Sequence, residues 1–171
     1  MPPMQPATAS AFPASIQRVA DALAALGHAQ QPVLLDAAAR TAQQAADALG
    51  VALGQIAKSI VFRHVGSGRA VLVVCAGDRR VDERAVTAQV GELARADAAF
   101  VRATTGFAIG GVSPVGHAQP PIALLDDSLW RFDRIWAAAG HPHAVFALQP
   151  GDLVRWLQVQ PSAVSLAPPG A

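Results

Sequence analysis

Two features of the sequence could do chemistry: its single lysine and one glycine-rich stretch. Lys58 is the only lysine of the 171-residue chain, and the other twelve of its 13 basic residues are arginine. An ammonium group is a compact positive charge that suits a phosphate or a developing oxyanion. Lys58 lies in QIAKSIVF, where a helical turn meets an expected strand. We interpret it as a candidate catalytic residue, with an ordinary solvated lysine as the alternative.

The glycine-rich stretch, GFAIGGVSPVGH, spans residues 106–117 and carries apolar residues among its glycines. Gly110 and Gly111 permit backbone conformations that other residues avoid, and they let a ligand approach the main chain closely. Successive amide groups in such a turn can bind an anion. The stretch is therefore either a ligand-binding loop with catalytic amides or a tight structural turn between two elements.

The second half of this stretch offers a hydroxyl but no visible partner for it. Ser113 has no general base at a recognisable spacing, and the stretch does not match the G-x-S-x-G pattern of a nucleophilic serine. A serine hydrolase is consequently the last-ranked hypothesis, and Ser113 stays a candidate catalytic residue as part of the loop. Pro114 stiffens the turn and Gly116 and His117 close it, and all three are candidate substrate-binding residues.

Histidine and cysteine add little to this set. His141 and His143 flank Pro142, which indicates a turn, and two histidines are too few to specify a metal. We keep His141 as a candidate ligand-binding residue.

Cys75 is the only cysteine, so no intrachain disulfide can form and a reducing cytoplasm is expected. Its strand-like surroundings, VLVVCA, favour a buried core position over a nucleophile.

The elements that must position these residues are a mixture of helices and strands. Capping residues and helical spacing predict helices over 15–27, 41–50, 82–91 and 150–158 and a helical turn after Asp97. Apolar runs predict strands near 32–36, 59–64, 69–77, 92–96, 121–126, 134–140 and 143–148. Gly66-Ser67-Gly68 predicts a hairpin between two of them. Because helices and strands do not alternate strictly, the fold class expected is α+β with a mainly antiparallel sheet.

Composition and charge limit the partners. Hydrophobic residues make up 52% of the chain and charged residues 15%, and no apolar run reaches the ~20 residues that cross a bilayer. A net charge of +1 does not suit a protein that binds long stretches of duplex DNA. Neither a membrane nor DNA is therefore an expected partner.

We expect a disordered leader over 1–12, one domain over 13–160 and a flexible tail over 161–171.

Three segments together resemble one known family. QIAKSIVF, TTGFAIGGVSPVGH and AAAGHPHAVFALQPGDLVRWL are similar, in that order, to segments of the YbaK/prolyl-tRNA-synthetase-associated editing domains. The likeness runs from about Ile16 to Leu157. Ser59 stands where the alanine-clearing branch carries asparagine, and Val145 where the cysteine-clearing branch carries aspartate. The sequence therefore assigns neither of these two specificities.

The resemblance implies a fold, an activity and partners. The fold would be a curved, barrel-like, mostly antiparallel mixed sheet surrounded by helices. The activity would be hydrolysis of the ester of a mischarged tRNA, with tRNA(Pro) as the first candidate, without a metal or organic cofactor. The partner would be the aminoacyl-tRNA 3′ end, and the weak net charge leaves room for an aminoacyl-tRNA synthetase as a second one. The alternative is a non-catalytic module that binds an aminoacyl-adenosine end or a protein partner.

Overall fold

The computed structural model describes residues 12–36 and 39–168. Within these residues the helices are α1 (Ala14–Ala25), α2 (Ala42–Leu49), α3 (Glu83–Val90), α4 (Ala98–Thr105) and α5 (Pro150–Leu157). The longer strands are β2 (Ile56–His64), β3 (Ala70–Ala76), β5 (Leu93–Arg95), β6 (Ile122–Asp126), β7 (Ile135–Ala138) and β8 (Ala144–Leu148). Two-residue strands are β1 (Val33–Leu34), β4 (Arg80–Val81), β9 (Pro161–Ser162) and β10 (Ser165–Leu166), and two 3₁₀ turns, η1 (Leu53–Gln55) and η2 (Asp127–Arg131), complete the set.

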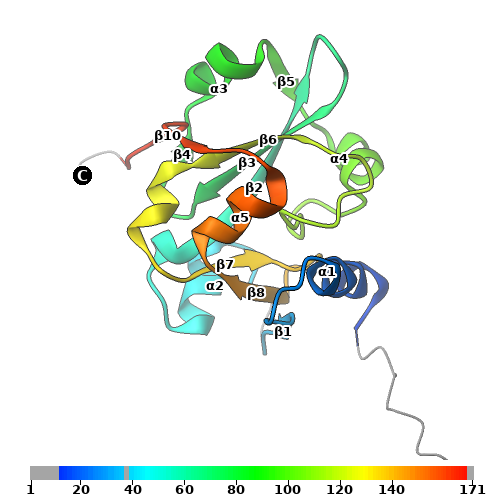
Figure 1. Ribbon diagram of the computed structural model, residues 1–171, viewed down its shortest axis with the longest axis vertical. Helices are drawn as coiled ribbons and strands as arrows, with labels where there is room; N and C mark the ends of the chain where they lie inside the picture. The colour runs from blue at the N-terminus through cyan, green and yellow to red at the C-terminus, as the bar shows by residue number, and fades with distance from the viewer. Residues whose placement is uncertain (1–11, 37–38, 169–171) are drawn as a thin grey trace, which may run out of the picture.

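The main sheet is mixed and open. Its strand order is β1-β8-β7-β2-β3-β6-β9, with β5 added beside β2, and a separate pair joins β10 to β4. Pairs β1–β8, β2–β3, β2–β5, β7–β8 and β4–β10 are antiparallel, and pairs β2–β7, β3–β6 and β6–β9 are parallel. The α+β class and the mostly antiparallel mixed sheet are thus confirmed, but the sheet does not close into the expected barrel. The β2–β3 hairpin crosses the molecule between α2 and α3 (Figure 1).

Short-range signals in the sequence set the ends of the helices. The side chains of Thr41, Asp82 and Asp97 each accept a hydrogen bond from a first-turn amide, as capping residues do. α2 ends at Gly50, which adopts the left-handed conformation that favours glycine. The predicted hairpin is also confirmed, since β2 and β3 pair in register from Ala57↔Ala76 to Arg63↔Ala70.

The two faces of the β2–β3 hairpin pack against different helices. On one face, alternate β3 side chains such as Leu72 and Val74 join α1, α5 and the buried Phe107 in the largest core cluster. On the other face, Val71, Val73 and Cys75 pack with Val86 of α3. A third, smaller cluster holds α2 against Ile56 and Trp136. Because successive strand residues point to opposite faces, each residue of β2 is committed to one of these environments.

The expected domain boundaries meet the structure at two points. The leader over 1–12 lies outside the described residues except for Phe12, which packs against the main core. At the other end, β9 pairs with β6 and β10 pairs with β4, so the chain is built into sheets beyond residue 160. The flexible tail expected from 161 is therefore wrong at least as far as Leu166. No helix within 12–36 and 39–168 is long and apolar enough to cross a membrane.

Candidate functional site

One edge of β2 is left unpaired in its middle. Along its other edge β2 pairs with β3, but along this edge Ile56 and Ala57 pair with β7, and Phe62 to His64 pair with β5. Among the described residues no strand pairs with 58–61 there. β7 and β5 therefore leave a gap in the sheet, and residues from both strands border a cavity at that point.

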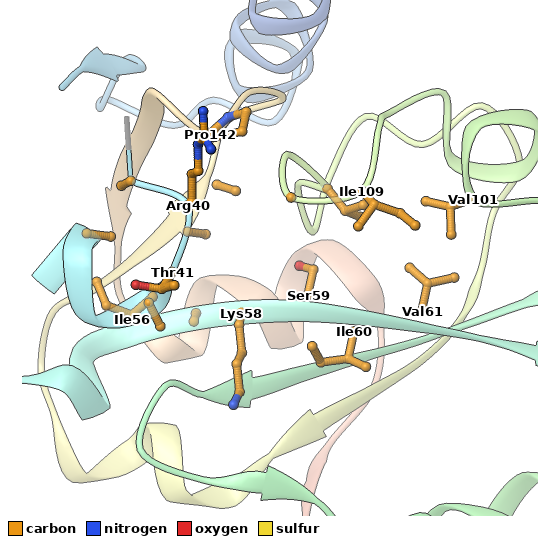
Figure 2. Close-up of a pocket in the computed structure, with 18 of the residues that line it drawn as sticks. Arg40, Thr41, Ile56, Lys58, Ser59, Ile60, Val61, Val101, Ile109 and Pro142 are labelled. Carbon is orange, nitrogen blue, oxygen red and sulfur yellow. The ribbon is translucent and has the colours of Figure 1, made fainter. Parts of the chain in front are cut away.

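The cavity has a volume of about 680 Å³. Its walls are formed by the start of α2, the middle of β2, β5, the loop from Ile109 to Val112 and the turn at His141 and Pro142. Figure 2 shows Ile109 and Pro142 above β2, on the side toward which Ser59 points. Most of the lining side chains are apolar, so polar contacts to a ligand must come from the few polar side chains and from the main chain.

The main chain of Ser59 faces this gap. The carbonyl of Ile56 accepts from the Gly77 amide (2.7 Å), and the His64 amide donates to the Arg69 carbonyl (2.8 Å). Since the register is unbroken and antiparallel bonding alternates, even-numbered residues of β2 bond to β3 and odd-numbered ones face away from it. The Ser59 N–H and C=O consequently point into the gap. Its Oγ is buried and has no hydrogen-bond partner among the described residues.

Two segments far apart in sequence meet at the mouth of the cavity. A Cβ added to Gly111 would lie 2.9 Å from the Cα and N of His141, and one added to Gly110 would lie 3.7 Å from Pro142. Gly110 has a φ of +93°, which a residue with a side chain rarely adopts. The absence of a side chain at Gly111 therefore allows the loop backbone to contact the 140–142 turn directly, whereas the positive φ is what favours glycine at position 110.

The amides of the loop are not equivalent as donors. The Gly111 amide donates to the Ala108 carbonyl (3.0 Å), so it is already used inside the loop. No hydrogen bond among the described residues uses the amide of Gly110 or Val112, and both residues line the cavity. Of the two glycines predicted to supply oxyanion donors, the structure therefore leaves Gly110 available.

The second half of the loop turns away from the cavity. Ser113 and Pro114 are buried, and the Ser113 Oγ accepts a hydrogen bond from the Val115 amide (3.1 Å). Gly116 packs under α1, where an added Cβ would lie 3.4 Å from Ala22. Ser113, Pro114, Gly116 and His117 do not line the cavity. The sequence grouped them with Gly110, but the fold separates them from it.

His117 contributes to the support of the loop. Its Nε2 lies 2.6 Å from the Ser113 carbonyl, so Nε2 carries the proton and donates, and its Nδ1 is buried with no hydrogen-bond partner within 12–36 and 39–168. Its ring contacts Phe107 edge to face. Burial lowers the pKa of His117 below its usual 6.5, which favours the neutral ring in the folded protein.

Lys58 borders the cavity, but its side chain leaves β2 on the other face. Figure 2 shows the ammonium extending away from Ser59 and Ile109. Lys58 also pairs with Cys75 of β3, whose side chain belongs to the core cluster on that face. The two candidates from the sequence, Lys58 and the glycine loop, thus come together only in part. Lys58 and the loop border the same cavity, but the Lys58 ammonium points to the opposite face of the sheet.

His141 is the predicted histidine that the structure does bring to the cavity. Its Nδ1 accepts a hydrogen bond from the His143 amide (3.1 Å). In the neutral ring this leaves the proton on Nε2, which is then a potential donor to a ligand. The turn that carries His141 is the one that contacts Gly111, so the ring is held beside the loop.

Cys75 is a core residue, as expected from its sequence. Burial, followed by the charge of Asp126, raises the pKa of its thiol to about 12, so the reactive thiolate is scarce at neutral pH. Asp126 is itself buried, and burial alone would raise its pKa. Hydrogen bonds from Ser128, Ala76 and Ser165 outweigh this effect and lower it. These groups hold β3, β6 and the C-terminal strands together.

Sequence reasoning did not identify the Ser59 main chain or the role of the β2 edge. No local signal could have found them, because a strand edge is free or paired according to which distant strands arrive beside it. Alternation along β2 does predict that Lys58 and Ser59 face opposite sides. Which of the two faces meets the glycine loop is decided by packing.

Comparison with known proteins gives the site a context. The family model described as the aminoacyl-tRNA editing domain matches residues 36–156. The Bacillus subtilis protein YwhH, which has no assigned activity, is 40% identical over 114 residues, covering 66% of this chain and 72% of that protein. A Ser/Thr-tRNA deacylase of Escherichia coli, ProXp-y, is 33% identical over 115 residues, covering 64% of this chain and 68% of that protein.

A solved structure is also similar to this chain. It is the structure of a proposed trans-editing enzyme for prolyl tRNA synthetase, and it matches with a TM-score of 0.85 and 40% sequence identity. The match covers 91% of this chain and 99% of the other. The cavity, the free edge of β2 and the glycine loop all lie within the matched 36–156 segment.

Proposed function

The chain belongs to the aminoacyl-tRNA editing domain family, and on that premise we propose that it is a deacylase acting in trans on mischarged tRNA. The observation that carries the proposal is the cavity at the β2 gap. Its apolar walls are interrupted by the Ser59 main chain, which faces the gap in the sheet, and by the Gly110 amide, which has no hydrogen-bond partner among the described residues. An aminoacyl ester carries a small side chain, an ammonium and a polarisable carbonyl, and such a cavity has a place for each.

The main chain would supply most of the contacts to the reacting group. In this proposal the Gly110 amide would donate to the ester carbonyl oxygen, and the Ser59 carbonyl would accept from the α-ammonium. A preorganised donor to an oxyanion is worth about 3–4 kcal/mol in a site shielded from water. His141, which lines the cavity, would donate a further hydrogen bond through Nε2. Gly111, Ser113, Pro114, Gly116 and His117 would hold this arrangement in place without touching the substrate.

An activated ester does not require a nucleophilic side chain. A water oxygen attacks the carbonyl carbon, and the bond to the ribose oxygen then breaks. The ribose oxygen takes up a proton, and with water as the nucleophile the products are a free amino acid and a tRNA with its terminal hydroxyl restored. The buried Ser113 and the high-pKa thiol of Cys75 have no part in this scheme.

Lys58 would bind and position the terminal nucleotide, and it would not stabilise the oxyanion. Its ammonium extends to the far face of β2, away from Ser59 and Ile109. A phosphate or ribose oxygen of the terminal nucleotide held there would fix the ester in the cavity, and positioning of this kind can contribute substantially to rate. We expect the loss of Lys58 to weaken turnover mainly through substrate positioning.

Small amino acids on tRNA(Pro) are the first substrates to test, with a prolyl-tRNA synthetase as the first partner. The proposed trans-editing enzyme and the Ser/Thr-tRNA deacylase among the relatives motivate this choice. A hydrophobic pocket separates side chains that differ by one methylene by only about 1–3 kcal/mol, so several amino acids must be compared.

The experiment is deacylation of a panel of labelled aminoacyl-tRNAs. Alanyl, cysteinyl, seryl, threonyl and prolyl esters on tRNA(Pro) and on their cognate tRNAs are incubated with wild type, Lys58→Ala and Lys58→Arg. We expect hydrolysis of at least one mischarged tRNA, a loss of tenfold or more in Lys58→Ala by removal of the positioning charge, and partial recovery in Lys58→Arg. If no ester is hydrolysed faster than in buffer, the chain is not a deacylase, and tight binding of a non-hydrolysable aminoacyl-adenosine would then indicate a binding module.

A further inference from the structure

A second cavity, of about 500 Å³, lies on the far face of β2. Three cationic side chains line it: Lys58 from β2, Arg80 from β4 and Arg84 from α3. Arg80 and Arg84 are exposed. Among the described residues none of the three forms an ion pair within 4 Å, so their charges are available to a ligand.

Two carboxylates also border this cavity, Asp82 and Glu83. Asp82 caps α3 and accepts a hydrogen bond from the Ala85 amide (3.3 Å). Glu83 is exposed in the first turn of that helix and has no basic partner within 4 Å among the described residues. The three cations therefore exceed the two anions, and Glu83 is the side chain that would repel a bound anion.

The two cavities are neighbours on β2. Lys58, Ile60, Phe62 and Glu83 border both of them. The Lys58 side chain leaves β2 on the face away from Ser59 and lines the second cavity, while the Ser59 main chain faces the gap at the first. A ligand that occupies both must carry a small apolar or polar head at one end and negative charge at the other.

We propose that this second cavity binds the phosphodiester backbone of single-stranded RNA next to the esterified ribose. The proposal rests on the proposed function, since it extends the same substrate from the ester to its nucleotide chain. Arginine suits this ligand because its planar guanidinium binds two phosphate oxygens at once. Arg80 and Arg84 would contact phosphate oxygens, and Lys58 would hold the nucleotide at the junction of the two cavities.

The test is RNA binding, which needs no turnover. Fluorescence anisotropy measures the Kd of a labelled single-stranded RNA tetranucleotide with a free 3′ hydroxyl, over a series of salt concentrations. The proteins are wild type, Arg80→Gln/Arg84→Gln, Glu83→Gln and Arg69→Gln. Arg69 is the matched control: it is an exposed arginine beside the β2–β3 turn and lines neither cavity, and its guanidinium donates to the Pro120 carbonyl.

We expect the double variant to bind roughly tenfold more weakly and its log Kd to depend on log salt with a slope smaller by about 1.4, because two phosphate contacts on a single strand are lost. Glu83→Gln should bind about two- to fivefold more tightly by removal of the repelling charge, and Arg69→Gln should match wild type. Inorganic phosphate should displace the RNA only at concentrations far above the RNA Kd.

The site is overturned if the double variant keeps the wild-type Kd and salt slope, if Glu83→Gln binds no more tightly, or if the RNA does not bind at all. It is also overturned if inorganic phosphate displaces the labelled RNA at concentrations near the RNA Kd. The cavity would then be a site for a free anion. The tetranucleotide carries no ester, so this result is independent of the deacylation panel. If the four proteins bind the RNA as expected but no ester of the panel is hydrolysed, the RNA site is supported and only the proposed deacylase activity is overturned.

Discussion

Gly111 and His141 are in backbone contact across the mouth of the cavity, although thirty residues of sequence separate them. A Cβ added to Gly111 would lie 2.9 Å from the Cα of His141. This contact joins the glycine loop to the turn after β7, and so it sets the position of the Gly110 amide and of the His141 ring in one step. The geometry of the cavity depends on it.

Gly111→Ala should therefore disrupt the site. The new methyl group must displace the backbone of the 140–142 turn, at a cost of about 1–3 kcal/mol in the free energy of unfolding. A shift of the order of 1 Å at a reacting group can lower turnover up to about a hundredfold. Denaturant unfolding and the deacylation rate measure the two effects.

Gly151→Ala is the matched control for this substitution. Gly151 lies in α5, has nothing within 4 Å of an added Cβ, and its φ is not positive. We expect unchanged activity and a gain of up to about 1 kcal/mol, because alanine favours the helix. Equal activity of the two variants would contradict the importance of the Gly111–His141 contact.

Ser113→Ala should cost stability and leave the chemical step intact. The hydroxyl is buried and accepts from the Val115 amide, which would lose its partner at a cost of about 1–3 kcal/mol. Turnover of the best substrate should stay within a few-fold of wild type in the folded protein. A thousandfold loss without unfolding would instead identify Ser113 as a nucleophile.

Ser59→Ala and Ser128→Ala should affect stability in different ways. The Ser59 hydroxyl has no partner in the part of the chain that the structure describes, so its removal should leave the free energy of unfolding unchanged or raise it by up to about 1 kcal/mol. The Ser128 hydroxyl donates to the buried Asp126, so its removal should lower stability by about 1–3 kcal/mol. Chemical denaturation of both variants under one set of conditions makes the comparison. Equal losses would show that Ser59 is hydrogen-bonded in solution.

His117 should make the protein less stable in mild acid. Its pKa is lowered by burial in the folded state, so the unfolded chain takes up a proton at a higher pH than the native protein does. The contribution is complete above pH 6.5 and is lost as the pH falls from there toward the native pKa. The free energy of unfolding of wild type, measured between pH 8 and 5, should decrease in this range.

A His117→Gln variant separates this effect from acid groups elsewhere. It should show a flatter profile over the same range, because glutamine does not titrate. Asp126, whose pKa is lowered from 3.8, loses its contribution only at lower pH. A slope of equal size in wild type and His117→Gln would assign the pH dependence to other groups.

The sequence by itself determined the local structure of this protein. Thr41, Asp82 and Asp97 cap helices and Gly50 ends one because these effects depend on neighbours within one turn. The β2–β3 hairpin and the buried Cys75 could be predicted for the same reason: short-range turn chemistry and an apolar run suffice. The three segments that resemble the editing domains also carried enough order and spacing to identify the family.

Tertiary structure alone decided which of the candidate residues meet. Ser113 to His117 begin only three residues after Gly110, yet packing under α1 turns them away from the cavity. Lys58 and Ser59 are adjacent, yet they serve opposite faces of β2, and the gap that exposes the Ser59 main chain exists only because β7 and β5 pair with the two ends of that strand. Strand pairing and core packing join residues that are distant along the chain, and no short stretch of sequence contains both partners.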